Sequence, residues 1–208
     1  MQLEDYILTH SDKEPDYLAD IHRNTHVKLL NPRMVSGPFQ GRVLAMFCKM
    51  IQPQVALEIG TFTGYSALCI AEALTPHGIL HTIEINEELE EIIQENFSRT
   101  SIGDKVKLHI GNALEIIEKF EETFDLVYID GDKREYLAYY EAIFPKVRSG
   151  GFILADNTLW NGKVIQPTKQ NDKQTLSILA FNKAIKDDER IEKIILPIRD
   201  GLTIIRKK

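Results

Sequence analysis

The sequence predicts an α/β fold with a mostly parallel sheet covered by helices on both faces. From residue 54 onward, short apolar runs alternate with amphipathic stretches of helical length. This alternation is typical of βαβ units, whose right-handed crossovers place successive strands in parallel. The end of the chain differs, because Ile191–Leu196 and Leu202–Ile205 are joined by a short segment containing Asp200-Gly201, a hairpin turn signal. We therefore expect the last strand to be antiparallel.

Two helices are expected before the first strand. Residues 14–30 show a loose helical period that ends before Pro32. Residues 38–51 begin with a proline, which suits a helix start, and place apolar side chains at three-to-four spacing.

Seven strands and five helices are expected after them. The expected strands are Val55–Ile59, Ile79–Ile83, Val106–Ile110, Phe124–Ile129, Phe152–Ala155, Ile191–Leu196 and Leu202–Ile205. The expected helices are Tyr65–Leu74, Glu87–Phe97, Ala113–Phe120, Glu135–Val147 and Thr175–Lys186. No repeat or linker interrupts them, so residues 1–208 are expected to form one domain.

Composition and charge disfavour several classes of function. A net charge of −6 would repel a nucleic-acid backbone or an anionic membrane surface, so neither is an expected partner. No apolar run approaches the roughly 18 residues of a membrane span, and no basic, apolar leader opens the sequence. Cys48 and Cys69 lack the spacing of a disulfide framework or a zinc site. These features indicate a cytoplasmic protein.

A turn bounded by glycines follows the first strand, in Glu58-Ile59-Gly60-Thr61-Phe62-Thr63-Gly64. Glycines there let the backbone approach a ligand closely. Glu84 closes the second strand, where an acid suits hydrogen bonds to ribose hydroxyls. The spacing G-x-x-x-G lacks the glycine that seats a pyrophosphate against the helix, which favours a nucleoside without pyrophosphate.

Oxygen-bearing side chains stand at the carboxyl ends of two later strands: Asp130, Asp132, Asp156 and Asn157. Open α/β sheets bind ligands at this edge. If the two strands are neighbours, about 4.8 Å apart, these side chains could converge on Mg²⁺, Mn²⁺ or Ca²⁺. Asp156 and Asn157 can both be ligands only if the chain leaves strand geometry there. Each acid alone could equally be a turn former or a helix cap, Asp132 in particular.

Lys133 follows the first pair of acids directly. Beside a divalent cation it could act as a proton acceptor. The alternative is an ordinary surface lysine in the first turn of a helix.

Three segments together resemble the signatures of the cation-dependent small-molecule O-methyltransferases, a group that includes the caffeoyl-CoA and catechol O-methyltransferases. They are Glu58 to Ser66, Tyr128 to Lys133, and Asp156-Asn157-Thr158-Leu159-Trp160-Asn161-Gly162. The resemblance runs in order from about Met34 to the terminal hairpin. It implies a Rossmann-like, doubly wound sheet of seven strands, with the N-terminal helices of residues 1–52 contributing to the donor and acceptor sites.

The resemblance also implies ligands and roles. The methyl donor would be S-adenosylmethionine, and Mg²⁺, Mn²⁺ or Ca²⁺ would be held by Asp130, Asp156 and Asn157. Lys133, beside Asp130, would be the general base. The residues implied around the donor are Val35, Glu58, Gly60, Ser66, Glu84, Ala113 and Asp132.

The acceptor implied is a vicinal dihydroxy aromatic molecule, free or linked to CoA, and the expected assembly is a homodimer. Lys163, Lys169 and Lys173 could hold an anionic handle of the acceptor, or belong to a solvated loop. Ser36 stands where the family often carries a threonine.

Three alternative functions would each require other features. A nicotinamide oxidoreductase would explain the glycine turn and Glu84 but should carry G-x-G-x-x-G. A nucleic-acid methyltransferase should show a basic face. A non-catalytic nucleoside-binding protein would bind the donor without turnover. His22 and His26 have the spacing of metal ligands, but no third ligand accompanies them.

Overall fold

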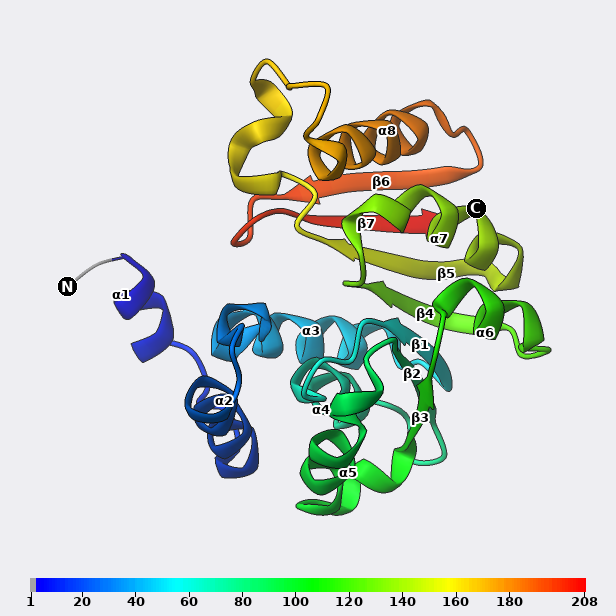
Figure 1. The fold of residues 1–208 in the computed structure, drawn as a ribbon. Helices are drawn as coiled ribbons and strands as arrows, with labels where there is room; N and C mark the ends of the chain where they lie inside the picture. The colour runs from blue at the N-terminus through cyan, green and yellow to red at the C-terminus, as the bar shows by residue number, and fades with distance from the viewer. Residues whose placement is uncertain (1–2) are drawn as a thin grey trace.

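A seven-stranded sheet forms the centre of the molecule, which we describe for residues 3–208 from a computed structural model (Figure 1). Its strand order is β3-β2-β1-β4-β5-β7-β6. The strands are β1 Val55–Ile59, β2 Ile79–Glu84, β3 Val106–Ile110, β4 Phe124–Ile129, β5 Val147–Asp156, β6 Ile191–Leu196 and β7 Leu202–Lys207. The first five are parallel, and β7 is antiparallel to both β5 and β6. The predicted antiparallel last strand is therefore confirmed.

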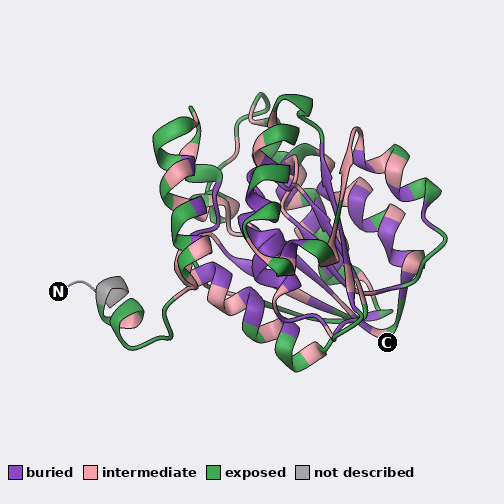
Figure 2. Ribbon diagram, turned by 90° about the horizontal axis from the view of Figure 1, so that it is seen from below, coloured by how far each residue is buried: buried purple, intermediate pink, exposed green. Residues whose placement is uncertain are grey.

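Helices cover both faces of the sheet, as predicted. They are α1 Leu3–Thr9, α2 Asp16–Lys28, α3 Gly37–Ile51, α4 Tyr65–Ala71, α5 Glu90–Ser98, α6 Ala113–Lys119, α7 Tyr136–Ile143 and α8 Lys173–Asp187. One buried cluster joins α2 to α5 with one face of the strands, and a second joins α6, α7 and α8 with the other face. Figure 2 shows the strands buried between these layers.

The alternation of side chains along β4 explains the two clusters. Leu126 and Tyr128 point to the cluster of α2 to α5, whereas Val127 and Ile129 point to the cluster of α6 to α8. Successive strand residues face opposite sides of a sheet, so a strand covered on both faces is largely apolar. This is why short, continuous apolar runs indicated the central strands.

The predicted helix Glu135–Val147 is too long. The α-helix ends at Ile143, and Val147 already belongs to β5, which is therefore longer than the predicted Phe152–Ala155. Pro145 fits the helix end, because it has no backbone N–H to continue the helical hydrogen bonds, and a short 3-10 turn, Phe144–Lys146, follows.

Helix α1 was not predicted. It is a seven-residue helix that projects from the body of the molecule in Figure 1. Its seven residues make only about two turns, which is too short for a helical period to be recognised in the sequence.

The other helices differ from prediction mainly at their ends. The predicted helix Glu87–Phe97 begins as a 3-10 turn, Glu87–Leu89, and becomes α-helical at Glu90. Among residues 3–208, no helix combines the length and apolarity needed to cross a membrane. Cys48 and Cys69 are both buried as free thiols.

Candidate active site

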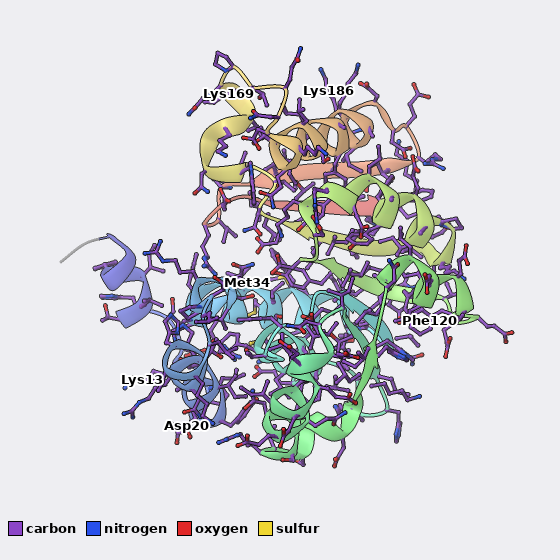
Figure 3. The ribbon with its side chains drawn as sticks, in the orientation of Figure 1. Lys13, Asp20, Met34, Phe120, Lys169 and Lys186 are labelled. Carbon is purple, nitrogen blue, oxygen red and sulfur yellow. The ribbon has the colours of Figure 1, made fainter. Side chains whose placement is uncertain are left out.

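A cavity of about 680 Å³ opens where the parallel strands end. It is bordered by the strand ends and by the loop before α3, whose Met34 is labelled in Figure 3. The predicted site residues that line it are Val35, Gly60, Ser66, Glu84, Ala113, Asp130, Asp132, Lys133, Asp156 and Asn157. Glu58 is the predicted site residue that does not line the cavity.

Gly60 brings the ends of β1 and β4 close together. Its φ of +101° lies in the region that favours glycine, and a Cβ at this position would lie 2.5 Å from the carbonyl oxygen of Asp130. The backbone N–H of Asp130 donates to the carbonyl of Ile59 at 2.9 Å. The glycine turn therefore forms one wall of the same cavity as the acids on β4.

Glu58 lies below this turn and is completely buried. The Thr82 hydroxyl donates to its Oε2 at 2.5 Å, whereas its Oε1 is buried without a hydrogen-bond partner. Burial raises the pKa of Glu58 to about 8, although hydrogen bonds from Ser66 and Thr82 oppose the rise. A direct contact of Glu58 with the donor stays a prediction.

Glu84 ties the glycine turn to the end of β2. Its Oε2 accepts from the backbone N–H of Phe62 at 2.8 Å, and its Oε1 accepts from the N–H of Asn86 at 2.9 Å. Phe62 itself has a φ of +52°. Each carboxylate oxygen keeps a further lone pair, so Glu84 can still accept hydrogen bonds from two ribose hydroxyls.

Asp130 and Asp156 lie side by side. In the pairing of β4 with β5, Ile129 is opposite Ala155, and one acid follows each of these residues. The predicted neighbourhood of these two strands is thus observed. Burial raises the pKa of Asp130 to about 6; the Lys133 ammonium opposes this rise, and the negative charge of Asp156 adds to it.

The chain turns out of the strand at Asn157. This residue has a φ of +56°, and β5 ends at Asp156. The departure from strand geometry, which both residues need if they are to share a ligand, is therefore present.

A divalent cation is compatible with these residues. Within residues 3–208, no three Asp, Glu, His or Cys side chains form a metal-binding group by themselves. The predicted set contains two carboxylates and takes its third oxygen from the amide of Asn157. Asp156 is 4% exposed, and its Oδ1 is buried without any hydrogen-bond donor. A buried anionic oxygen without a partner is the kind of ligand that a hard cation would satisfy.

Lys133 is not a surface lysine. It is 8% exposed, and its Nζ donates to Asp130 Oδ1 at 2.7 Å and to the Tyr136 hydroxyl at 2.6 Å. The amine is therefore directed into the acidic site. Asp132, in contrast, caps the turn that contains Lys133, accepts from Arg134 and also borders the cavity.

Two residues of the site were missed by the sequence analysis. Gln40 of α3 and Arg199 of the β6–β7 turn are linked to Asp156 by hydrogen bonds. Neither belongs to a recognisable local motif, so no sequence signal pointed to them. Lys163, Lys169 and Lys173 do not line the cavity; Lys163 pairs with Asp172, and Lys169 lies on the outer loop in Figure 3.

The fold and this cavity define a class of protein, the S-adenosylmethionine-dependent methyltransferases. The O-methyltransferase of Bacillus cereus, solved in complex with SAH, has a TM-score of 0.92 and 27% identity, with 99% of this chain and 97% of that chain covered. SAH-bound PaMTH1 of Podospora anserina has a TM-score of 0.90 and 27% identity, with 99% and 94% covered.

Sequence comparison identifies the family. Residues 8–208 match the O-methyltransferase family. The caffeoyl-CoA O-methyltransferase of Petroselinum crispum is 34% identical over 218 aligned residues, which cover 99% of this chain and 90% of the relative. That of Eucalyptus gunnii is also 34% identical, with 99% and 87% covered. The chain therefore belongs to the O-methyltransferase family and is an S-adenosylmethionine-dependent enzyme, as its three signature segments predicted.

Proposed function

We propose that this O-methyltransferase methylates one hydroxyl of a vicinal dihydroxy aromatic molecule with the help of a divalent cation. Asp130, Asp156 and Asn157 would hold the cation. The observation that carries this proposal is the buried Oδ1 of Asp156, which has no partner and belongs to a cavity-lining residue beside Asp130. When bound, such a cation supplies Lewis-acid chemistry that eases ionisation of a coordinated hydroxyl.

The protein's own groups account for the rest of the reaction. With Lys133 as the neutral amine, the hydroxyl proton passes to its Nζ, the oxygen bonds to the methyl carbon, and the carbon–sulfur bond of the sulfonium breaks to release S-adenosylhomocysteine. Gly60 and Glu84, at the ends of β1 and β2, would hold the donor, and Lys133, which follows β4, would face the acceptor. Fixing the two reactants in line supplies much of the rate gain.

Chelation tests the cation directly. Excess EDTA should abolish methyl transfer, and added Mg²⁺ or Mn²⁺ should restore it, because the ligands are hard oxygens. Binding of S-adenosylhomocysteine, measured by calorimetry, should survive EDTA and serves as the control. Full activity in excess chelator would contradict cation assistance and leave the methyltransferase assignment intact.

The acceptor is proposed as a catechol, with the CoA thioester of a catechol acid as one form. The relatives named caffeoyl-CoA O-methyltransferase support this form. A methyl-transfer screen should compare each catechol acid with its CoA thioester, using monohydroxy analogues as controls. Catechols should turn over and monohydroxy analogues should not. Donor binding without turnover of any catechol would favour the non-catalytic alternative.

A further inference from the structure

Gln40 and Arg199 form a chain of hydrogen bonds that ends on Asp156. Gln40 is 2% exposed, and its Nε2 donates to Asp156 Oδ2 at 2.7 Å and to the Tyr128 hydroxyl at 2.9 Å. On its other side, Gln40 Oε1 accepts from Arg199 Nη1 at 2.9 Å. The Gln40 amide thus lies between the guanidinium of Arg199 and the carboxylate of Asp156.

The chemistry of these partners sets the orientation of the amide. A guanidinium only donates hydrogen bonds and an ionised carboxylate only accepts them. With the amide flipped, Oε1 would face the carboxylate of Asp156 and the NH₂ group would face Arg199, which are two repulsive contacts. Arg199 therefore directs the NH₂ group of Gln40 toward Asp156.

Arg199 and its turn contact two other parts of the chain, the segment before α3 and the loop after β5. It lies in the turn between β6 and β7 with a φ of +48°, and it also donates to the carbonyl of Ser36, just before α3. The same turn is bonded to the segment after β5, because Leu159 N–H donates to the Asp200 carbonyl at 2.9 Å. The C-terminal hairpin thus joins α3 to the loop that follows Asp156.

The two oxygens of Asp156 consequently differ. Oδ2 is occupied by Gln40, whereas Oδ1 is buried without a donor. We propose that Gln40, oriented by Arg199, is a positioning residue that holds Asp156 so that Oδ1 alone is presented to the divalent cation. This inference rests on the proposed function, since it concerns the same cation.

Binding of Mn²⁺ alone, without donor or acceptor, tests the inference. Electron paramagnetic resonance and calorimetry would measure its dissociation constant in the full chain. Gln40→Met keeps the side-chain length but removes both polar ends, so we expect binding to weaken by about 10- to 100-fold, as is typical when a partner of a ligand is lost. Gln94→Met makes the same chemical change on an exposed position of α5 and should bind Mn²⁺ like the wild type.

A double-mutant cycle separates positioning from a general loss of structure. Arg199→Met should also weaken Mn²⁺ binding, because the amide of Gln40 is then free to turn. The double variant Gln40→Met/Arg199→Met should bind no more weakly than Gln40→Met, since Arg199 acts through Gln40. Affinity for S-adenosylhomocysteine and the melting temperature would report whether each variant is folded.

The outcomes separate this inference from the proposed function. If the wild type binds Mn²⁺ and Gln40→Met binds it equally well, the positioning role is wrong and the cation site stands. Additive losses in a folded double variant would likewise overturn the path through Gln40. If the wild type binds no Mn²⁺, both the cation and the positioning role are wrong.

Discussion

Lys133 shows how a single side chain depends on its surroundings. Its Nζ lies between the carboxylate of Asp130 and the hydroxyl of Tyr136, and it also lies 4.8 Å from the centroid of the Tyr136 ring. Lys133→Met keeps the length and removes the proton acceptor, so the turnover number should fall by roughly 100-fold or more. Steady-state kinetics over a series of catechols would measure this.

The size of that defect should depend on the acceptor. Catechols with more acidic hydroxyls need less help in ionising, so they should be less affected by Lys133→Met. An equal defect across the series would assign Lys133 to substrate positioning instead of proton transfer.

Glu84 makes a second prediction at the residue scale. Glu84→Ala should weaken binding of S-adenosylhomocysteine by about 1.5 to 3 kcal/mol, the range for hydrogen bonds to a charged group. Part of this loss would come from the turn, because Glu84 also accepts from the N–H of Phe62. Calorimetric titration with S-adenosylhomocysteine would measure it, and Mn²⁺ affinity should stay unchanged. An unaltered dissociation constant would contradict the placement of the ribose.

Glu58 predicts a dependence of stability on pH. Its pKa is raised to about 8 in the folded state, above the ordinary value of 4.5. The unfolded chain therefore loses this proton first, and the contribution of Glu58 to stability declines as the pH rises from about 4.5 to 8. The glutamine of Glu58→Gln cannot ionise. The free energy of unfolding of this variant should therefore increase relative to that of the wild type as the pH rises from 5 to 8. Denaturant titrations at several pH values would show a constant difference if the raised pKa is wrong.

At the scale of elements, the turn after β1 depends on glycine for two separate reasons. Gly60 has a positive φ, and a Cβ there would lie 2.5 Å from the Asp130 carbonyl oxygen. Gly162 also has a positive φ, +71°, but has nothing within 4 Å of its Cβ position. Gly162→Ala should therefore cost only backbone strain, about 1 kcal/mol.

Gly60→Ala should cost more than this control. The β1 and β4 ends would have to separate, which adds a packing loss of about 1 to 3 kcal/mol. Urea unfolding of the two variants side by side measures the difference. Equal losses would mean that the close approach of β1 to β4 contributes nothing to stability.

At the scale of the whole molecule, we propose a homodimer. Several large apolar side chains are exposed on the α2 and α3 region of the chain, namely Val27, Leu30, Met34, Met46 and Met50. Self-association that covers such side chains is favourable because it removes apolar surface from water. Sedimentation velocity should give twice the chain mass of 23.8 kDa. A single species of 23.8 kDa at micromolar concentration would contradict the dimer.

Much of the fold follows from local patterns. The bounds of β4 match the apolar run from which it was predicted, because a strand that is buried on both faces is largely apolar. The bounds of β3 and β6 also match, although these two edge strands are mostly not buried. The neighbourhood of Asp130 and Asp156 was also predictable in outline, since parallel strands end at the same edge of a sheet. The sequence is sufficient for such inferences, because the regular geometry of strands and parallel sheets fixes where each residue of a strand lies.

The remaining features of the site depend on contacts between residues far apart in the sequence. Gln40 contacts Asp156 across 116 positions of the chain, and Arg199 reaches Gln40 from the last hairpin. No periodicity links these residues, because their contact exists only once α3 and the β6–β7 turn have both packed against the sheet. The burial of Glu58 and its raised pKa arise in the same way. The residue types at the site could be inferred from short sequence motifs. Their hydrogen-bond partners and their protonation depend on tertiary packing, because packing decides which side chains are buried away from water.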